Sequence, residues 1–349
     1  MAGLTGPIEN CMSANPAIAE AEQLAHRFLP AAGGLRVAPI PGGANNRVWK
    51  VEAPGGPYVL KQYYQPTAAA RNRFASERAF YAHATSCAGG SVPKALAWND
   101  TDQAALFEFV PGRKVLPSEV GTDQVSEALS FLQVLNHPPI VPPLPLPEAA
   151  EACFRVADHL AVVEQRLWRL QGLPKDSKDD LARAAGEFVA KELLPAWATV
   201  AKDVGAQVHE LDAVAPARCA SPSDFGFHNA LLRDSGGLCF FDFEYAGWDD
   251  PAKTIGDFLC QPEIPVGPGH REAVIATVAR MFPDDRLLSA RARALLPVYQ
   301  IKWCGIMLND FTPADRLRRD FALSAAAAES RRLRQLERAR AALAALTLP

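Results

Sequence analysis

Three polar residues in one stretch of the chain have the types and the spacing that phosphoryl transfer requires. Asp224 stands five residues before Asn229, and Asp242 follows Asn229 by thirteen residues. In phosphoryl transfer, one carboxylate receives the proton of an acceptor hydroxyl, while an asparagine and a second carboxylate hold Mg²⁺. The stretch therefore predicts a site that combines a base with two oxygen ligands for magnesium.

A short hairpin is the element that must bring these residues to one cleft. The apolar runs 230–232 and 238–241 are the expected strands. Between them, 233–237 reads Arg-Asp-Ser-Gly-Gly, which is typical of a turn. The hairpin would place the loop before it and the loop after it side by side.

The first third of the chain has the pattern of a strand meander with two helices. A Pro-Gly pair at 111–112 breaks this pattern and is the expected boundary between two parts. Apolar periodicity predicts helices over 17–28 and 68–85. Alternation and turn residues predict strands over 35–40, 47–52, 58–63, 92–98 and 104–109.

After the boundary the pattern becomes mainly helical. A proline-rich connection, 138–147, cannot be helical inside. Pro297 is expected to kink or split the helix that contains it, because proline removes a backbone donor. The predicted helices cover 122–135, 148–170, 178–200, 204–211, 288–308 and 320–346.

Composition excludes several classes of function. Of the 349 residues, 49% are hydrophobic and 21% charged, which is typical of a globular protein long enough for two domains. A net charge of -3 gives no electrostatic basis for binding nucleic acid or an anionic membrane. No membrane span or secretory signal is expected. The seven scattered cysteines indicate reduced thiols, so we expect a cytoplasmic protein. We also expect a monomer or a homodimer.

The order of these elements resembles one enzyme family. Strands with one helix, a Pro-Gly break, and then helices that hold a D-x-x-x-x-N hairpin are similar to the aminoglycoside phosphotransferase and choline kinase family, small-molecule relatives of protein kinases. The resemblance covers roughly 33–320. It implies an α+β, protein-kinase-like fold of two lobes, a small β-rich N-terminal lobe at 1–111 and a mainly helical C-terminal lobe at 112–349.

The strongest part of the resemblance is the core motif. Asp224 matches the catalytic Asp of the family, Asn229 its Mg²⁺-binding Asn, and Asp242 its second metal-binding Asp. The run Asp-Phe-Glu-Tyr-Ala-Gly at 242–247 looks especially like choline kinases. Related kinases use similar sequences there, so the run does not fix the substrate.

The resemblance also implies a nucleotide site upstream of this motif. Small residues at 42–46 match the loop that covers the phosphates of ATP, and 107–110 matches the hinge whose backbone hydrogen-bonds adenine. Lys61 matches the lysine that holds the α- and β-phosphates, and Glu77 its glutamate partner. The implied nucleotide-binding residues are Gly42, Gly43, Asn45, Lys61, Glu77, Phe107 and Phe109.

The sequence departs from the family just before Asp224. The family motif begins His-Gly-Asp or His-Asn-Asp, but here Pro222 and Ser223 precede the aspartate. Pro222 cannot supply the histidine's hydrogen bond, although its fixed φ can stiffen the turn. The alternative function is therefore a catalytically impaired, kinase-like nucleotide-binding or scaffold protein. We favour activity, because the polar groups for metal and alcohol are present.

His228 either compensates for the missing histidine, lines the substrate pocket, or is an ordinary core or surface histidine.

Other polar residues have two readings each. Glu244 shares a face with Asp242 and could contact Mg²⁺ or a cationic substrate group. Trp248 beside Asp249 and Asp250 could recognise a cation, or it is a buried Trp next to a helix-capping Asp. Asp257 matches a family Asp that we expect to accept backbone N–H groups of the catalytic loop.

Together these features predict an ATP- and Mg²⁺-dependent kinase that phosphorylates a small-molecule alcohol by direct in-line transfer. The expected acceptor is an amino sugar, an amino alcohol or a sugar. By analogy with related kinases, Trp303, Asn309 and Asp310 lie on a late helix that helps line the acceptor pocket. A peptide substrate is disfavoured, because the chain has no A-P-E element and no long segment between Asp242 and Pro251.

Overall fold

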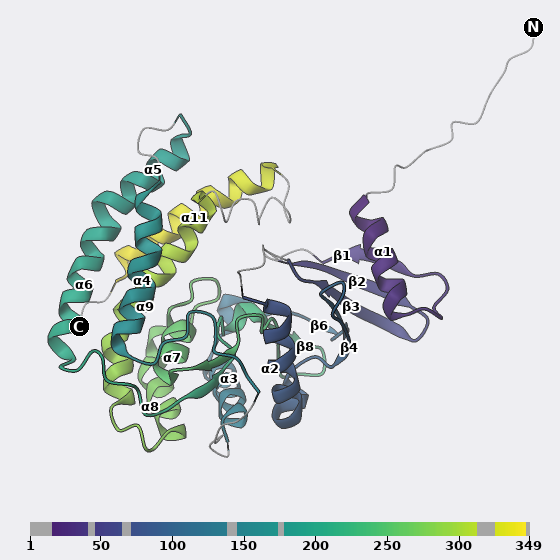
Figure 1. Cartoon of the computed structure of the whole chain (residues 1–349), viewed down its shortest axis with the longest axis horizontal. Helices are drawn as coiled ribbons and strands as arrows, with labels where there is room; N and C mark the ends of the chain where they lie inside the picture. Colours follow the sequence, from purple (N-terminus) through teal and green to yellow (C-terminus); the bar gives the residue numbers. More distant parts are fainter. Residues whose placement is uncertain are drawn as a thin grey trace, which may run out of the picture.

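A computed structural model (Figure 1) describes residues 16–40, 46–64, 71–137, 145–173, 178–312 and 325–346. Of the predicted phosphate loop, Gly42, Gly43 and Asn45 lie outside the described residues, whereas Asn46 is described. A sheet and its flanking helices occupy one end of the molecule, and most helices occupy the other. This confirms the predicted α+β, kinase-like fold.

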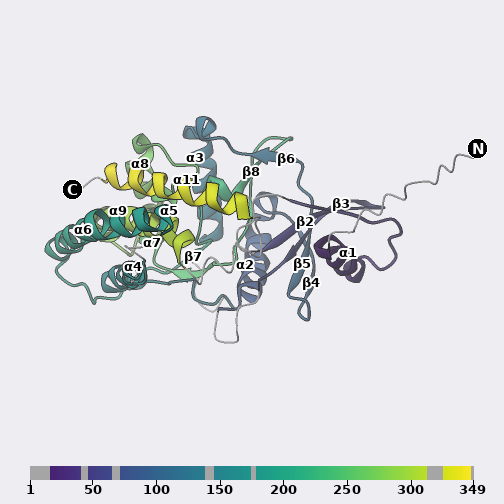
Figure 2. The ribbon, with the colours of Figure 1, turned by 90° about the horizontal axis from the view of Figure 1, so that it is seen from above.

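The sheet near the N-terminus is antiparallel, with the strand order β1-β2-β3-β5-β4. Alternating residues of its strands face a small core, in which Trp49 and Val51 of β2 pack with Leu24 of the first helix. Figure 2 shows that helix, α1, along one side of the sheet. The elements are α1 (Pro16–Phe28), β1 (Arg36–Pro39), β2 (Arg47–Ala53), β3 (Gly56–Gln62), β4 (Ala95–Asn99) and β5 (Ala104–Glu108).

Helix α2 (Arg73–Ala88) lies between this sheet and the helical part of the molecule (Figure 2). The Asn72 side chain accepts a hydrogen bond from the Ala75 N–H at 3.0 Å, which caps the helix start. Tyr81 packs its ring against Phe107 of β5 and Phe243 of the helical part, with ring centroids 5.0 and 5.2 Å apart. One aromatic cluster therefore joins the two parts of the molecule.

The helical part is built around α9, which contacts α4, α6, α7, α8 and α11. Its core is apolar and continuous with the cluster around Phe243. Its helices are α3 (Thr122–Leu135), α4 (Val156–Gln171), α5 (Asp180–Phe188), α6 (Leu194–Gln207), α7 (Pro251–Cys260), α8 (Arg271–Met281), α9 (Leu288–Met307) and α11 (Ala325–Ala344). None of the helices within the described ranges is long and apolar enough to cross a membrane.

Two small sheets position the loop after β7, which carries Asp224, and the loop after β9, which carries Asp242. The predicted hairpin is present as β8 (Ala230–Arg233) and β9 (Leu238–Phe240), and β6 (Gly112–Lys114) pairs with β8. Gly112 is required there, because a Cβ would lie 2.5 Å from the Leu232 carbonyl oxygen. Strand β7 (Cys219–Ser221) pairs with β10 (Gly247–Asp249). The chain thus leaves the first sheet at β5 and enters the second part at β6, close to the proposed boundary after residue 111.

Two predicted helix bounds were wrong, and a third helix is continuous where a split was one expectation. The helix predicted from 148 begins only at Val156, because Glu148 forms a bridge with Trp248 beside β10. The helix predicted over 204–211 is the end of α6, which stops at Gln207. Pro297 does not split α9, which continues from Leu288 to Met307 with Pro297 buried among core residues.

Candidate active site

A buried ion-pair cluster connects the sheet, α2 and the loop after β9. Lys61 of β3 donates from Nζ to Glu77 Oε2 of α2 and to Asp242 Oδ1, both at 2.6 Å. Burial opposes the charge of Lys61, but the carboxylates of Asp242 and Glu77 raise its pKa, so it stays protonated. The structure thus brings together three residues that are far apart in the sequence.

The backbone at Asp242 is held in a left-handed conformation, with a φ of 68°. A non-glycine residue pays roughly 1 kcal/mol or more for this conformation, which is common at functional sites. The next N–H, of Phe243, donates to Glu77 Oε1 at 3.2 Å, and the Phe243 ring is buried. These contacts hold the Asp242 carboxylate next to Lys61.

Side chains from three elements brace the loop that carries Asp224. The Ser221 hydroxyl accepts hydrogen bonds from the Ser223 N–H at 3.0 Å and from the Thr254 hydroxyl at 2.9 Å. Asn136, at the end of α3, accepts from the Ala220 N–H at 2.8 Å. These bonds support the turn at Pro222, where the family histidine is missing.

Asp224 is held by the loop's own side chains. His228 Nε2 lies 3.2 Å from Asp224 Oδ1, and Asn229 Nδ2 donates to the Asp224 carbonyl at 2.9 Å. Burial alone would raise the pKa of Asp224, but His228 lowers it below its usual value. In return, Asp224 raises the pKa of His228 against the opposing effect of burial. Asp224 is therefore a carboxylate at neutral pH.

Asn229 and Asp242 have the donor chemistry that Mg²⁺ requires. Asn229 uses its Nδ2 toward Asp224, and its Oδ1 has no hydrogen bond to a described residue. Asp242 is about one-third exposed, with a side-chain exposure of 36%. The described residues contain no group of three or more His, Cys, Asp or Glu able to hold a metal. A site of one carboxylate and one amide still fits Mg²⁺, which keeps several waters and takes phosphate oxygens as ligands.

The predicted hinge begins at the end of β5, with Phe107 inside the strand and Phe109 just after it. Phe107 is buried in the aromatic cluster, with ring centroids 5.5 Å from Trp98, and Phe109 lies under the Lys50 ammonium at 5.0 Å. The Glu108 N–H already donates to the Lys94 carbonyl at 3.0 Å. A backbone N–H of this segment that donates a hydrogen bond to adenine would therefore lie beyond Glu108.

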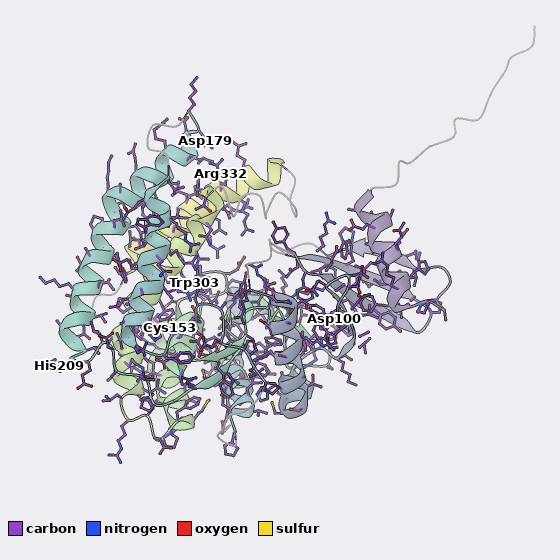
Figure 3. The ribbon with its side chains drawn as sticks, in the orientation of Figure 1. Asp100, Cys153, Asp179, His209, Trp303 and Arg332 are labelled. Atoms are coloured by element: carbon purple, nitrogen blue, oxygen red, sulfur yellow. The ribbon has the colours of Figure 1, made fainter. Side chains whose placement is uncertain are left out.

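A cavity of about 430 Å³ adjoins Asp224 on the side of the helical part. Trp303 and Asn309 line it, as expected, but Asp310 does not; it lies buried behind the wall and accepts from Arg331 Nε at 2.8 Å. Figure 3 shows Trp303 on the side of the helices, far from Asp100 and the sheet. The sequence did not predict five residues of α4 and α11 that line the cavity, namely Arg166, Arg169, Arg331, Gln335 and Arg338.

Two further carboxylates have partners other than those expected. Asp257 pairs with Lys302 of α9 at 2.9 Å, rather than with backbone N–H groups of the catalytic loop. Glu244 is fully buried, accepts from Asn46 Nδ2 at 2.7 Å and lies 3.5 Å from Arg73. Glu244 therefore joins the two parts of the molecule rather than facing a substrate.

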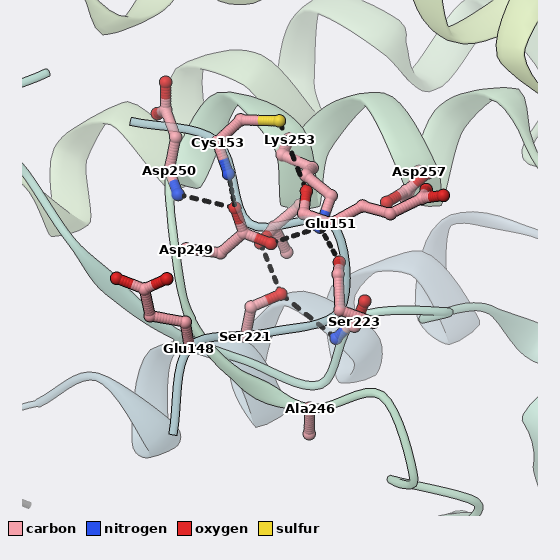
Figure 4. A network of polar contacts seen from close by, with 12 residues as sticks. Glu148, Glu151, Cys153, Ser221, Ser223, Ala246, Asp249, Asp250, Lys253 and Asp257 are labelled. Carbon is pink, nitrogen blue, oxygen red and sulfur yellow. Dashed lines mark hydrogen bonds and ion pairs between the residues drawn. The ribbon is translucent and has the colours of Figure 1, made fainter. Parts of the chain in front are cut away.

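The carboxylates between the end of β10 and the start of α7 stabilise the fold around the proposed catalytic loop. Asp249 accepts from the Cys153 N–H at 3.0 Å and pairs with Lys253, in a buried network that also contains Ser221 and Ser223 (Figure 4). Asp250 caps α7 by accepting from the Ala252 N–H at 2.8 Å. Trp248 is buried. Trp248, Asp249 and Asp250 are therefore a buried Trp beside structural carboxylates, as in the second of the two interpretations above, and not a cation-binding group.

Several solved structures of small-molecule kinases and phosphotransferases are similar to this chain in fold. An ethanolamine kinase of Plasmodium vivax is 14% identical, with 93% of this chain and 85% of that chain covered and a TM-score of 0.58. A spectinomycin phosphotransferase in complex with ADP and spectinomycin is 12% identical over 92% and 98%, with a TM-score of 0.58. The choline kinase LicA of Streptococcus pneumoniae is 12% identical over 94% and 99%, with a TM-score of 0.55.

No curated protein matches the chain. The model of the phosphotransferase enzyme family matches residues 36–294, which is most of the chain and includes both the lysine cluster and the Asp224 loop. The predicted family and the prediction of a small-molecule kinase are thereby confirmed. This chain belongs to the phosphotransferase enzyme family.

Proposed function

We propose that this protein transfers the γ-phosphoryl group of ATP, with Mg²⁺, to a hydroxyl group of a small molecule. The observation that carries the proposal is the convergence of Lys61, Glu77 and Asp242 in one cluster, with Asp224 and Asn229 on the neighbouring loop. Nucleotide use is further supported by the ADP in the spectinomycin phosphotransferase complex. The names of similar structures, an ethanolamine kinase and a choline kinase, support a small-molecule alcohol as the acceptor class.

In this proposal each residue has a separate task. Asp224 orients the acceptor hydroxyl and takes its proton as the new O–P bond forms and the bond to the leaving ADP oxygen breaks. Lys61 binds the α- and β-phosphates, and Glu77 holds the lysine in place. Asn229 and Asp242 would hold Mg²⁺, which when bound neutralises charge on the phosphates. The depressed pKa of Asp224 keeps it ready to accept a proton at neutral pH.

Asp224→Asn tests the assignment. The amide fills the same space but cannot accept the proton, so we expect kcat to fall at least 100-fold, within the range for loss of general base catalysis. The assay is ATP-dependent phosphorylation of a panel of amino sugars, amino alcohols and sugars. ATP binding, measured by calorimetry with Mg²⁺, should be retained in the variant.

Asp234→Asn is the matched control, because Asp234 lies exposed in the turn of the same hairpin. It should have wild-type activity. Equal activity of wild type and Asp224→Asn would contradict the catalytic role. Nucleotide binding without transfer to any acceptor would instead favour the alternative, a nucleotide-binding or scaffold protein suggested by Pro222.

A further inference from the structure

The cavity next to Asp224 lies on the acceptor side of the site. It is bounded by α4, α9 and α11, and none of Lys61, Glu77 and Asp242 lines it. Among the described residues that line it are six basic side chains and four carboxylates. The basic residues are Arg73, Arg166, Arg169, Lys302, Arg331 and Arg338, and the acidic ones are Glu151, Asp224, Asp257 and Glu263.

The carboxylates of this lining already have cationic partners. Three of them form close pairs within the wall, and the fourth, Glu263, is largely exposed and lies 3.9 Å from Arg338. The close pairs are Glu151 with Arg166 at 2.6 Å, Asp257 with Lys302 at 2.9 Å, and Asp224 with His228 at 3.2 Å. Among the described residues of the wall, Glu263 is thus the one carboxylate without a close cationic partner.

The arginines, in contrast, have donors to spare. Arg331 uses its Nε toward Asp310, and its two terminal nitrogens have no hydrogen bond to a described residue. The side chain of Arg169 has no ion pair or hydrogen bond within the described part of the chain, and it is exposed at the cavity. Burial lowers the pKa of Arg331, against the opposing effect of the Glu263 carboxylate.

Buried donors at the same wall also lack acceptors. Trp303 Nε1 and Arg166 Nε are both buried without a hydrogen-bond partner, and the Arg166 residue is only 8% exposed. Both groups can only donate hydrogen bonds. The buried Gln335 Oε1 has no partner either, and its amide can also offer N–H groups. A buried donor without an acceptor is costly, so this wall is suited to a ligand that brings acceptor oxygens.

We propose that the acceptor is an alcohol that carries an acidic group, a carboxylate or a phosphate, bound by Arg331 and its neighbours Arg169 and Arg338. The planar guanidinium matches both groups through paired N–H···O bonds. The acid would lie against α4 and α11, which leaves the hydroxyl of the same molecule to approach Asp224. The inference rests on the proposed function, because it specifies the charge of that function's acceptor.

Four compounds on one sugar scaffold test the charge preference: D-glucuronate, D-glucose 6-phosphate, D-glucose and D-glucosamine. Binding to the full-length protein without nucleotide is measured by calorimetry and by saturation-transfer NMR. We expect one or both of the anionic compounds to bind at least about 10-fold more tightly than glucose, and glucosamine to bind most weakly, since a charge-assisted hydrogen bond contributes about 1.5–3 kcal/mol. The better of glucuronate and glucose 6-phosphate shows whether the group is a carboxylate or a phosphate.

Arg331→Gln should weaken binding of the preferred anionic compound about 10-fold to 100-fold and leave glucose unchanged. Arg334→Gln is the matched control, because Arg334 lies exposed on the same helix and does not line the cavity. Anionic compounds that bind no better than glucosamine, or that bind equally to wild type and Arg331→Gln, would overturn the inference.

A transfer assay with the same compounds separates this inference from the proposed function. Phosphorylation of glucosamine in preference to the acids would leave the proposed function standing and refute the acidic acceptor. Arg331-dependent binding of an acid, with no phosphorylation of any compound in this set or the wider panel, would leave the pocket assignment standing and refute the kinase activity.

Discussion

At the scale of single residues, the pair of Asp224 and His228 determines how the base responds to pH. His228 lowers the pKa of Asp224 although burial would raise it. His228→Gln keeps a hydrogen-bonding side chain and removes the charge, so the pKa of Asp224 should rise. Activity needs the carboxylate, and we therefore expect the acidic limb of the kcat/KM profile to move to higher pH.

The control for this prediction is His209→Gln, because His209 is exposed at the far end of the helical part (Figure 3). Its profile should coincide with that of the wild type. An unchanged acidic limb in His228→Gln would mean that His228 lines the pocket without tuning the base.

At the scale of elements, the packing of α7 on α9 holds the residues that brace the catalytic loop. A Cβ at Gly256 of α7 would lie 2.3 Å from the Tyr299 ring of α9. Gly256→Ala therefore requires the two helices to separate, and we expect a loss of unfolding free energy of about 1–3 kcal/mol. Because α7 also carries Thr254 and Asp257, activity should fall as well. Urea denaturation measures the first effect and the transfer assay the second.

Gly205→Ala on α6 is the matched substitution, because nothing lies within 4 Å of the added methyl group. Alanine is the better helix former, so this variant should be unchanged or more stable by up to about 1 kcal/mol. Equal stability of the two variants would contradict the tight contact between α7 and α9.

At the scale of the whole molecule, a buried network ties α4, α7 and α9 together through one histidine. His159 lies 2.6 Å from the Tyr299 hydroxyl and 3.2 Å from Asp250 Oδ2, and Arg291 also pairs with Asp250. Burial opposes the charged form, but Cys153 and Asp250 raise the pKa of His159 to about 9. The protonated histidine therefore stabilises the fold.

This raised pKa predicts how stability depends on pH. The contribution of His159 is complete below its usual pKa of about 6.5 and is lost as pH rises through 9, a change of up to about 3 kcal/mol. Burial raises the pKa of Glu77 to about 7 and that of the Cys239 thiol to about 11, so both groups also change stability as pH rises, and the difference between wild type and His159→Gln isolates the histidine. Urea midpoints should fall from about pH 7 to 9.5 in the wild type and stay flatter in His159→Gln. Parallel curves for the two proteins would refute the charged histidine.

Apolar periodicity and turn residues predicted the order of the helices and strands correctly. They failed where a segment pairs or packs with a part of the chain that is distant in the sequence. The hairpin around 233–237 and the helix at 122–135 follow from apolar periodicity and turn residues alone, and both are present. The region after 148 has a helical pattern, but pairing with β10 holds its first residues extended. Pro297 stays inside α9 because burial on all sides outweighs the lost backbone bond.

The sequence by itself determined the chemistry that this protein has available, because Asp224, Asn229 and Asp242 keep their spacing within one hairpin and its flanking loops. Lys61 and Glu77 could be added only by resemblance, and their ion pair depends on how α2 packs on the sheet. The charge of the acceptor cavity was decided by the tertiary structure alone. Its arginines come from helices more than a hundred residues apart, and whether each one is neutralised depends on the carboxylate that folding places beside it.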